Sequence, residues 1–569
     1  MDKIRSKEAI VQDIERLVAT KGYMNVLCEI GSKDMFVDPF DIQSPSDDTL
    51  TIQEMLYLVG LALKNNTMDW SEIDEETIQK SMKFTYLLLK ELHWSHNRSF
   101  SKALSEEINI ASDRPLDFAK QMFCDGDGSI EASFYADTNA YDMQYIEFAP
   151  KLYANDLEKI NSFGLDFKKA SIIFQALKLL MEVLHTARLK PENLPLSEDE
   201  MPTEELSAKD DFVFPFSSIC SYAIGLGIKN NTPISKEDVK NFLKLFSTEP
   251  GSTEQSSFQY PGDLNILYIK PIVHFTGDVE DMYYIPVAFF IAKSIYESPA
   301  YWMKKDPEYL DILAKNRGKA IEDTCYEFLL KTFKQQEVFV GVTIFKGKNK
   351  YTDIDALVIH NGSAIIVQSK GKKLTEASFR GDGEVLQNDF DKSINSAYKQ
   401  GLKSREALLS KEGFTFKDRN DNPLIFNNIK EAFVICVTAD VYPNIIMQTQ
   451  TLLDKKKDDP YCVPLNIFDL ETLGRYLKTP DIYIHYVQQR VKTFDKIFTF
   501  NETCVLGYYL SNNNNLTIPL GMDIMHIDQD FAKKIDENYV QDTHSFTIAK
   551  KKRKTKRRKK SKKRKNRRR

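Results

Sequence analysis

The sequence predicts an α/β protein, in which a mixed sheet flanked by helices follows a large, mainly helical region and precedes a disordered basic tail. Three observations lead to this prediction. Apolar residues recur at helical spacing through much of residues 1–210. Two strand-like runs flank Asn361-Gly362, and an apolar run typical of a buried strand, 432–438, follows a long predicted helix. The last 20 residues contain 17 Lys or Arg, too many charges for a packed core.

The first half of the chain is expected to be mostly helical. Amphipathic spacing predicts helices over the ranges 6–21, 52–64, 76–93, 170–189 and 287–296. A Ser-x-x-Asp cap predicts a further helix over 235–246. A loop is expected at 122–136, an acidic linker at 196–209, and a hairpin from 264–275 and 281–285.

The strongest functional signal surrounds Asn361-Gly362. This dipeptide favours a two-residue type I′ turn, whose two central residues both have positive φ. Such a turn places Asp355 opposite Gln368 and Asp353 opposite Lys370. Strand alternation then gathers the four polar side chains on one face of an otherwise apolar hairpin. That arrangement costs free energy unless the groups are solvated, paired or bound to a metal.

These residues carry a resemblance to a known family. Asp355 followed by Gln368-Ser369-Lys370 resembles the PD-(D/E)xK nuclease core in its Q-x-K variant, which Mrr-type restriction endonucleases and nuclease-related (NERD) domains use. The family places a glutamate on the preceding helix, and Glu322 lies at the edge of the apolar stripe of the predicted helix 318–333. The resemblance covers residues 286–495. It implies a restriction-endonuclease-like α/β core that hydrolyses phosphodiester bonds.

The resemblance also implies a metal site. Glu322 and Asp355 would hold Mg²⁺ or Mn²⁺, with the backbone carbonyl of Ser369 completing the coordination and Asp353 as an alternative carboxylate. Gln368 stands where the family usually has a second carboxylate. A neutral amide oxygen is a weaker ligand for Mg²⁺.

Other residues would serve the substrate. Lys370 would position or deprotonate the attacking water, and Gln368 would orient water or add a weak ligand. Lys392 and Gln400 are auxiliary candidates, because they lie on a long helix predicted over 384–410 that follows the hairpin. We expect DNA rather than RNA as the partner, and a homo-oligomer stays open.

The basic charge of the chain is concentrated in its C-terminal run, Lys550–Arg569. Removing its 17 basic residues from the total of 77 leaves 60 against 82 acidic residues, a net charge of −22. A body this acidic repels a polyanion, so strong non-specific binding of nucleic acid must come from the tail or from a local basic patch. The tail residues expected to bind nucleic acid are Lys550, Lys551, Lys552, Arg553, Arg557 and Arg558.

Composition restricts the other classes of function. No apolar run approaches 18 residues, so we expect no transmembrane helix. The N-terminus lacks the apolar segment of a signal peptide. The seven cysteines are scattered, and no two have zinc-ligand spacing. A cytoplasmic location is expected, or a nuclear one if the source is a eukaryote.

We therefore expect five regions: a mainly helical domain at 1–205, a mixed α/β connection at 206–310, a nuclease-like domain at 311–495, an extension at 496–549 and the tail at 550–569. The function expected is that of a metal-dependent endonuclease. One alternative is an inactive nuclease fold that acts as a nucleic-acid- or ribosome-binding adaptor through its tail. Another is a ribosome- or chromatin-associated protein in which the tail is the functional part.

Overall fold

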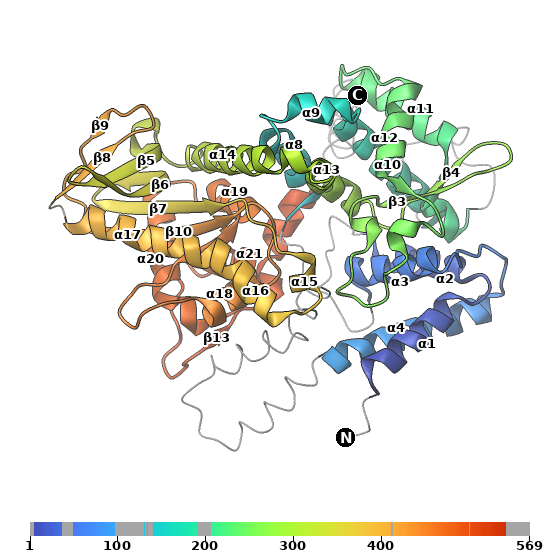
Figure 1. The fold of residues 1–569 in the computed structure, drawn as a ribbon. Helices are drawn as coiled ribbons and strands as arrows, with labels where there is room; N and C mark the ends of the chain where they lie inside the picture. The colour runs from blue at the N-terminus through green and yellow to red at the C-terminus, as the bar shows by residue number, and fades with distance from the viewer. Residues whose placement is uncertain are drawn as a thin grey trace, which may run out of the picture.

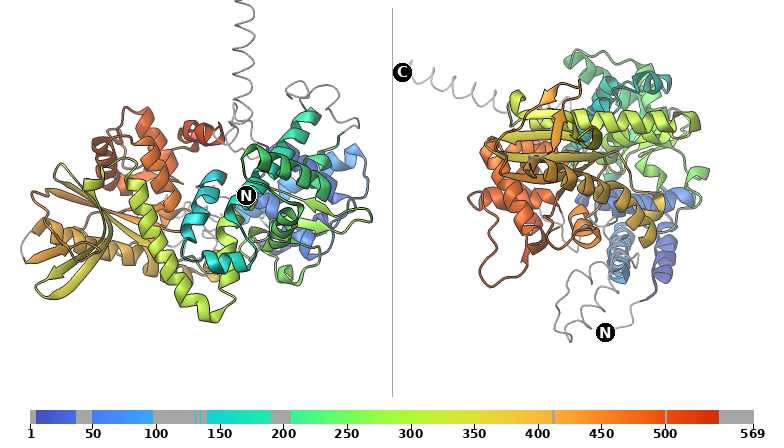
Figure 2. Two further views of the ribbon diagram at one scale, coloured as in Figure 1. Left: turned by 90° about the horizontal axis from the view of Figure 1, so that it is seen from above. Right: turned by 60° about the vertical axis from the view of Figure 1, so that its left-hand side comes forward.

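The computed structural model describes residues 5–36, 49–96, 130, 134, 140–189, 206–410, 413–499 and 501–541. The basic tail, most of the loop predicted at 122–136 and much of the linker predicted at 196–209 lie outside these residues. We call the described residues up to 309 the helical lobe and those from 310 onward the sheet lobe. The two lobes lie side by side, as Figures 1 and 2 show.

The helical lobe confirms the helices predicted from periodicity. Its helices are α1 (Lys7–Val18), α2 (Tyr23–Asp34), α3 (Ile52–Lys64), α4 (Glu75–His96), α8 (Asp142–Leu152), α9 (Leu157–Ser162), α10 (Phe167–Leu189), α11 (Phe216–Lys229), α12 (Lys236–Phe246) and α13 (Phe289–Met303). The predicted cap of α12 is present, since the Ser235 side chain accepts a hydrogen bond from the Asp238 backbone N–H.

Among the described helices, α10 alone is long and apolar enough to cross a membrane, judged by length and composition. Half of its most apolar 18-residue window is buried inside the protein. A core helix of a soluble protein passes the same test, so this helix is weak evidence for a membrane span.

A small four-stranded sheet completes the helical lobe. Its order is β1 (Val213–Pro215), β4 (Met282–Tyr284), β3 (Ile272–Phe275) and β2 (Ser247–Thr248). The antiparallel pair β3–β4 confirms the predicted hairpin, but residues 264–271 are not part of it. There the Asn265 side chain accepts from the Leu267 N–H and starts a 3₁₀ turn, Ile266–Tyr268. The strand therefore begins only at Ile272.

The sheet lobe is built on seven strands. Their order is β11 (Val463–Asn466), β10 (Glu431–Thr438), β7 (Ser363–Lys370), β6 (Asn349–His360), β5 (Val338–Lys346), β8 (Phe414–Lys417) and β9 (Pro423–Leu424). Neighbours from β7 to β9 are antiparallel, whereas β10 is parallel to both β7 and β11. Pro464 lies on the edge strand β11, where a missing backbone N–H is tolerated. Strands β5, β8 and β9 were not predicted.

Helices cover both faces of this sheet. One face packs against α14 (Leu310–Leu329), the helix that was predicted to carry Glu322, and the other packs against α17 (Ser396–Ser410). The long helix predicted over 384–410 is interrupted, because a π-helical segment, Asp391–Asn395, joins α16 (Gly383–Phe390) to α17. The remaining helices are α15 (Glu376–Phe379), α18 (Ile445–Leu452), α19 (Ile467–Tyr476), α20 (Pro480–Thr493) and α21 (Glu502–Ser511), with a short parallel pair β12 (Ile497–Phe498) and β13 (Met525–His526).

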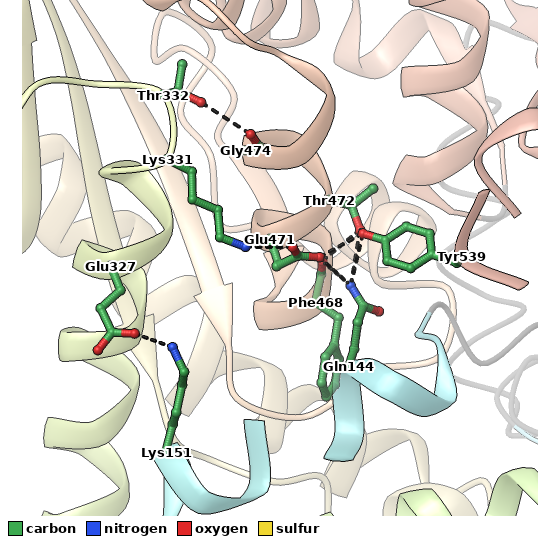
Figure 3. Close-up of polar contacts among 10 residues, drawn as sticks. All are labelled: Gln144, Lys151, Glu327, Lys331, Thr332, Phe468, Glu471, Thr472, Gly474 and Tyr539. Carbon is green, nitrogen blue, oxygen red and sulfur yellow. Dashed lines mark hydrogen bonds and ion pairs between the residues drawn. The ribbon is translucent and has the colours of Figure 1, made fainter. Parts of the chain in front are cut away.

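A buried hydrogen-bond network on Glu471 joins the lobes (Figure 3). Glu471 lies on α19 and accepts from Lys331 Nζ at 2.7 Å, from Gln144 Nε2 of α8 at 3.0 Å, and from Tyr539 Oη at 2.7 Å. Burial alone would raise the pKa of Glu471, but the hydrogen bonds from Lys331, Tyr539 and Gln144 lower it. The carboxylate is therefore charged, and it holds together four segments that are far apart in sequence.

The hairpin between β6 and β7 has the predicted register from the turn as far as Ala356 and Val367, but the predicted pairs Asp355–Gln368 and Asp353–Lys370 lie beyond the end of its pairing. Asn361 and Gly362 have φ values of 47° and 86°, as a type I′ turn requires, and His360 pairs with Ser363. A β-carbon on Gly362 would also lie only 3.0 Å from the backbone oxygen of Asn428. The turn therefore needs glycine both for its backbone conformation and for space.

Replacing Gly362 by alanine is predicted to destabilise the protein by about 1–2 kcal/mol, the cost of placing a β-carbon in the left-handed region. Gly225→Ala is the matched control, because Gly225 lies within α11 and a β-carbon there meets no atom within 4 Å. The control should stabilise the protein by about 0.5–1 kcal/mol. Denaturant midpoints measure both, and shifts of the same sign would contradict this account of the turn.

Candidate active site

The strands β6 and β7 separate beyond the hairpin. Their pairing ends at Ala356 and Val367. From there β6 continues alongside β5 to Asn349, while β7 continues alongside β10 to Lys370. We call this opening the fork, formed by residues 353–355 of β6 and 368–370 of β7. It lies where the sequence predicted a functional site.

At the fork, strand β6 also changes which of its side chains point to each face of the sheet. Ile354 packs in the core under α17, but Ala356 packs in the core under α14. In a regular strand, residues two apart share a face, so the strand turns over between them. Gly341 of β5, which lies across from this point, has a φ of 62°. Asp355 therefore lies at a bend.

The bend directs the carboxylate of Asp355 to Ser369. Its Oδ2 accepts from the Ser369 backbone N–H at 2.6 Å and from Ser369 Oγ at 3.0 Å. Burial raises the pKa of Asp355, and the Ser369 hydrogen bonds and the charge of Lys370 oppose that shift. The role predicted for the Ser369 carbonyl stays a prediction.

Glu322 reaches the same region from α14. Burial and the nearby negative charge of Asp355 raise the pKa of Glu322 to about 7, while Arg419 acts in the opposite direction. Two carboxylates from different elements thus repel each other at the fork. A divalent cation would relieve that repulsion.

Lys370 completes the charged set at the end of β7. Its Nζ donates to Gln400 Oε1 on α17 at 2.6 Å. The structure thus brings together Lys370 and one of the two auxiliary candidates. The other, Lys392, lies exposed in the π-helical segment. Because Gln400 is neutral, it orients the ammonium group without cancelling its charge.

The structure differs from the predicted single polar face. Gln368 is fully buried, and its Nε2 donates to the backbone oxygen of Asp353 at 2.7 Å. Ser404 Oγ of α17 donates to the same oxygen at 3.3 Å. The carboxylate of Asp353 instead pairs with Lys350 at 2.9 Å. The prediction failed because the alternation of β6 breaks at Asp355.

Sequence reasoning missed Arg419, which lies in the turn between β8 and β9. Its Nη1 pairs with Asp323 at 2.8 Å, and its Nη2 lies 3.8 Å from Glu322 Oε2. A β-carbon on Gly341 would lie 3.3 Å from Arg419 Nε, so the glycine gives the guanidinium room. No sequence signal pointed to Arg419, because β8 and β9 were not predicted.

The residues at the fork fit a divalent cation. Within the described part of the chain, no three His, Cys, Asp or Glu side chains converge into a metal-binding group. One or two carboxylates are nevertheless what Mg²⁺ commonly takes from a protein, together with water and substrate phosphate. Glu322 and Asp355 supply two. Gln368 Oε1 is a further buried oxygen, and the described residues give it no hydrogen-bond partner.

Comparisons with known proteins gave no match. No family model fits the chain, and neither the curated proteins nor the solved structures yielded a significant similarity. The function must therefore be inferred from the residues and their geometry.

The buried amide of Gln368 leads to a prediction at odds with the family pattern. Gln368→Glu would restore the usual carboxylate, but it would place that carboxylate against the Asp353 carbonyl, an acceptor facing an acceptor. We expect a loss of about 1–3 kcal/mol, the cost of leaving a buried polar group unpaired. Thermal denaturation without metal measures this loss. Gln387→Glu on α16 is the control, and equal midpoints for the two variants would refute the structural role of Gln368.

The raised pKa of Glu322 predicts how stability varies with pH. The folded protein holds a proton on Glu322 up to about pH 7, whereas the unfolded chain releases it near the ordinary value of 4.5. Stability without metal therefore falls as pH rises between these values. Glu322→Gln removes this loss, so its advantage in Tm over the wild type should grow from pH 5 to pH 8. Asp311→Asn, at the start of the same helix, should show no such trend, and a constant Tm difference for Glu322→Gln would contradict the prediction.

Proposed function

We propose that the protein is a metal-dependent nuclease that hydrolyses phosphodiester bonds, with the fork as its active site. The observation that carries this proposal is the proximity of Asp355 both to Glu322 and to Lys370 where β6 and β7 separate. The order of helix α14, antiparallel strands β5 to β7, helix α17 and parallel strand β10 accords with a restriction-endonuclease-like core. DNA is the favoured substrate.

Glu322 and Asp355 would hold the metal ion between α14 and β6. When bound, the ion would polarise the scissile phosphate and lower the pKa of the attacking water. Ser369 fixes the orientation of the Asp355 carboxylate through two hydrogen bonds to Oδ2. The carboxylate of Asp355 comes from the sheet, and the more exposed carboxylate of Glu322 comes from the helix.

Lys370 would act on the phosphate and on the water. Its ammonium group is held by the Gln400 side chain, 2.6 Å away, and its charge opposes the rise in the pKa of Asp355 that burial causes. A positive charge placed there before the reaction stabilises the negative charge that develops on the phosphate oxygens. The same ammonium group can orient the water for attack.

The alternative of an inactive nuclease fold has one observation in its favour. Gln368, at the position of the family's second carboxylate, donates its amide to a backbone oxygen and is shielded from solvent. An inactive fold would bind nucleic acid without cleaving it. Activity measurements separate the two functions directly.

Purified protein should cleave plasmid or linear duplex DNA with Mg²⁺ or Mn²⁺ and be inactive with EDTA. Asp355→Asn and Lys370→Met should each lower the single-turnover rate on the order of 10²-fold or more, the range for loss of a positioned catalytic group. Lys240→Met on α12 is the control for Lys370→Met. Binding without cleavage would favour the inactive adaptor, and cleavage that survives both substitutions would place the active site elsewhere.

A further inference from the structure

Beyond the fork, part of the sheet continues without β7. Strands β5 and β6 run on together to the turn at residues 346–350, and β8 pairs with the outer edge of β5. We call residues 343–353 and 414–424 the arm. It lies at the end of the sheet lobe that is farthest from the helical lobe, on the left of Figure 1 and of the first view in Figure 2.

The arm gathers positive charge on an acidic protein. Its cations, together with one from the adjoining helix α17, are Lys346, Lys348, Lys350, Lys417, Arg419 and Lys403. Three of them pair with carboxylates, namely Lys350, Lys417 and Arg419. For the other three, the described residues provide no carboxylate partner. The arm, with five cations against three aspartates, is therefore a local basic patch. Together with the tail, it is a source of attraction for nucleic acid on a body that would otherwise repel it.

Aromatic rings hold two of these unpaired cations in place. Lys346 Nζ lies 5.2 Å from the ring centre of Phe414 and 5.8 Å from that of Tyr351, and Lys403 Nζ lies 6.0 Å from the Tyr351 ring. A ring face attracts an ammonium group without neutralising it, so the charge stays available to a ligand. Tyr351 is fixed in turn, since its hydroxyl donates to Glu406.

The same arrangement distinguishes double-stranded from single-stranded ligands. Proteins that bind single strands offer open aromatic faces on which bases stack. Here Tyr351 and Phe414 are partly buried, and ammonium groups lie over their rings. The arm presents charge rather than stacking faces, which suits a duplex whose phosphates are outside and whose bases are already stacked.

The distance from the fork to the turn of the arm also matches a short stretch of duplex. Asp355 and Lys350 are five positions apart on extended β6, so their backbones are about 17 Å apart at the rise of a β-strand. That length matches about five base pairs of duplex, since each strand advances 3.4 Å per nucleotide. A duplex lying along β5 and β6 would contact the lysines at the turn while one of its phosphates lies at the fork.

We propose that the arm binds the phosphate backbone of double-stranded nucleic acid and delivers it to the fork. This inference rests on the proposed nuclease function and specifies the form of its substrate. Arg419 links the two regions, because it belongs to the arm and lies 3.8 Å from Glu322.

The test compares two variants of the chain. In each, three lysines are replaced, and Asp355→Asn is added to prevent cleavage. One replaces Lys346, Lys348 and Lys403 by Gln, and the control replaces Lys236, Lys240 and Lys244 of α12, exposed lysines at the other end of the molecule. The readout is the salt dependence of binding to a duplex oligonucleotide and to one of its single strands. The C-terminal tail is present in all variants and contributes equally.

The arm variant should lose about 2–3 from the slope of log K against log salt on the duplex, since each phosphate contact contributes about 0.9. The control should keep the slope of the chain that carries Asp355→Asn alone. A third variant with Arg at the three arm positions should restore binding, which separates loss of charge from misfolding. Equal slopes for the arm variant and the control would overturn the proposal, and so would an equal or larger loss on the single strand.

Failure of the arm and failure of the nuclease give different results. A wild-type chain that cleaves nothing, but whose duplex binding depends on the arm, would refute the active site and leave the arm standing. An active nuclease whose duplex binding does not depend on the arm lysines would refute the arm and leave the active site standing.

Discussion

Two hydrogen bonds onto the backbone oxygen of Asp353 hold the fork in its shape. Gln368 Nε2 reaches this oxygen from β7, and Ser404 Oγ reaches it from α17. The strands have separated here, so the oxygen would otherwise lack a ladder partner on that side, at a cost comparable to a lost hydrogen bond. A buried neutral amide thus satisfies this oxygen, while the carboxylate of Asp355 accepts from Ser369 of β7 and lies near Glu322. The amide at position 368 therefore has a structural role in this fold.

The parts of the site that depend on local interactions could be predicted from the sequence. The Asn361-Gly362 turn sets the register of β6 and β7, because its backbone conformation restricts how the strands leave it. The helix that carries Glu322 and the approach of Gln400 to the site were likewise predicted from periodicity and position. Sequence patterns located six of the ten described helices of the helical lobe, whereas α2, α8, α9 and α11 were not predicted.

The parts that depend on distant segments could not be predicted. The direction of the Asp355 side chain is set by a bend that involves Gly341 on β5. That strand was not predicted from the sequence. Arg419 comes close only because β8 returns to the edge of β5. The single polar face was inferred from strict alternation, and alternation fails where a strand turns over. Local patterns specify strands and turns, but the fork arises from the way three strands and a helix meet.

The network on Glu471 has a consequence for how the protein is made. Gln144 and Tyr539 both bind this carboxylate, yet 395 residues separate them. At about 5–20 residues per second, a ribosome needs about 20–80 s to synthesise the intervening chain. Gln144 of α8 lacks its α19 partner until 327 residues of that stretch have been made, and it lacks Tyr539 until the end of the stretch. The N-terminal helices therefore emerge with an unfinished surface, which nascent-chain chaperones are suited to shield until the C-terminal part arrives.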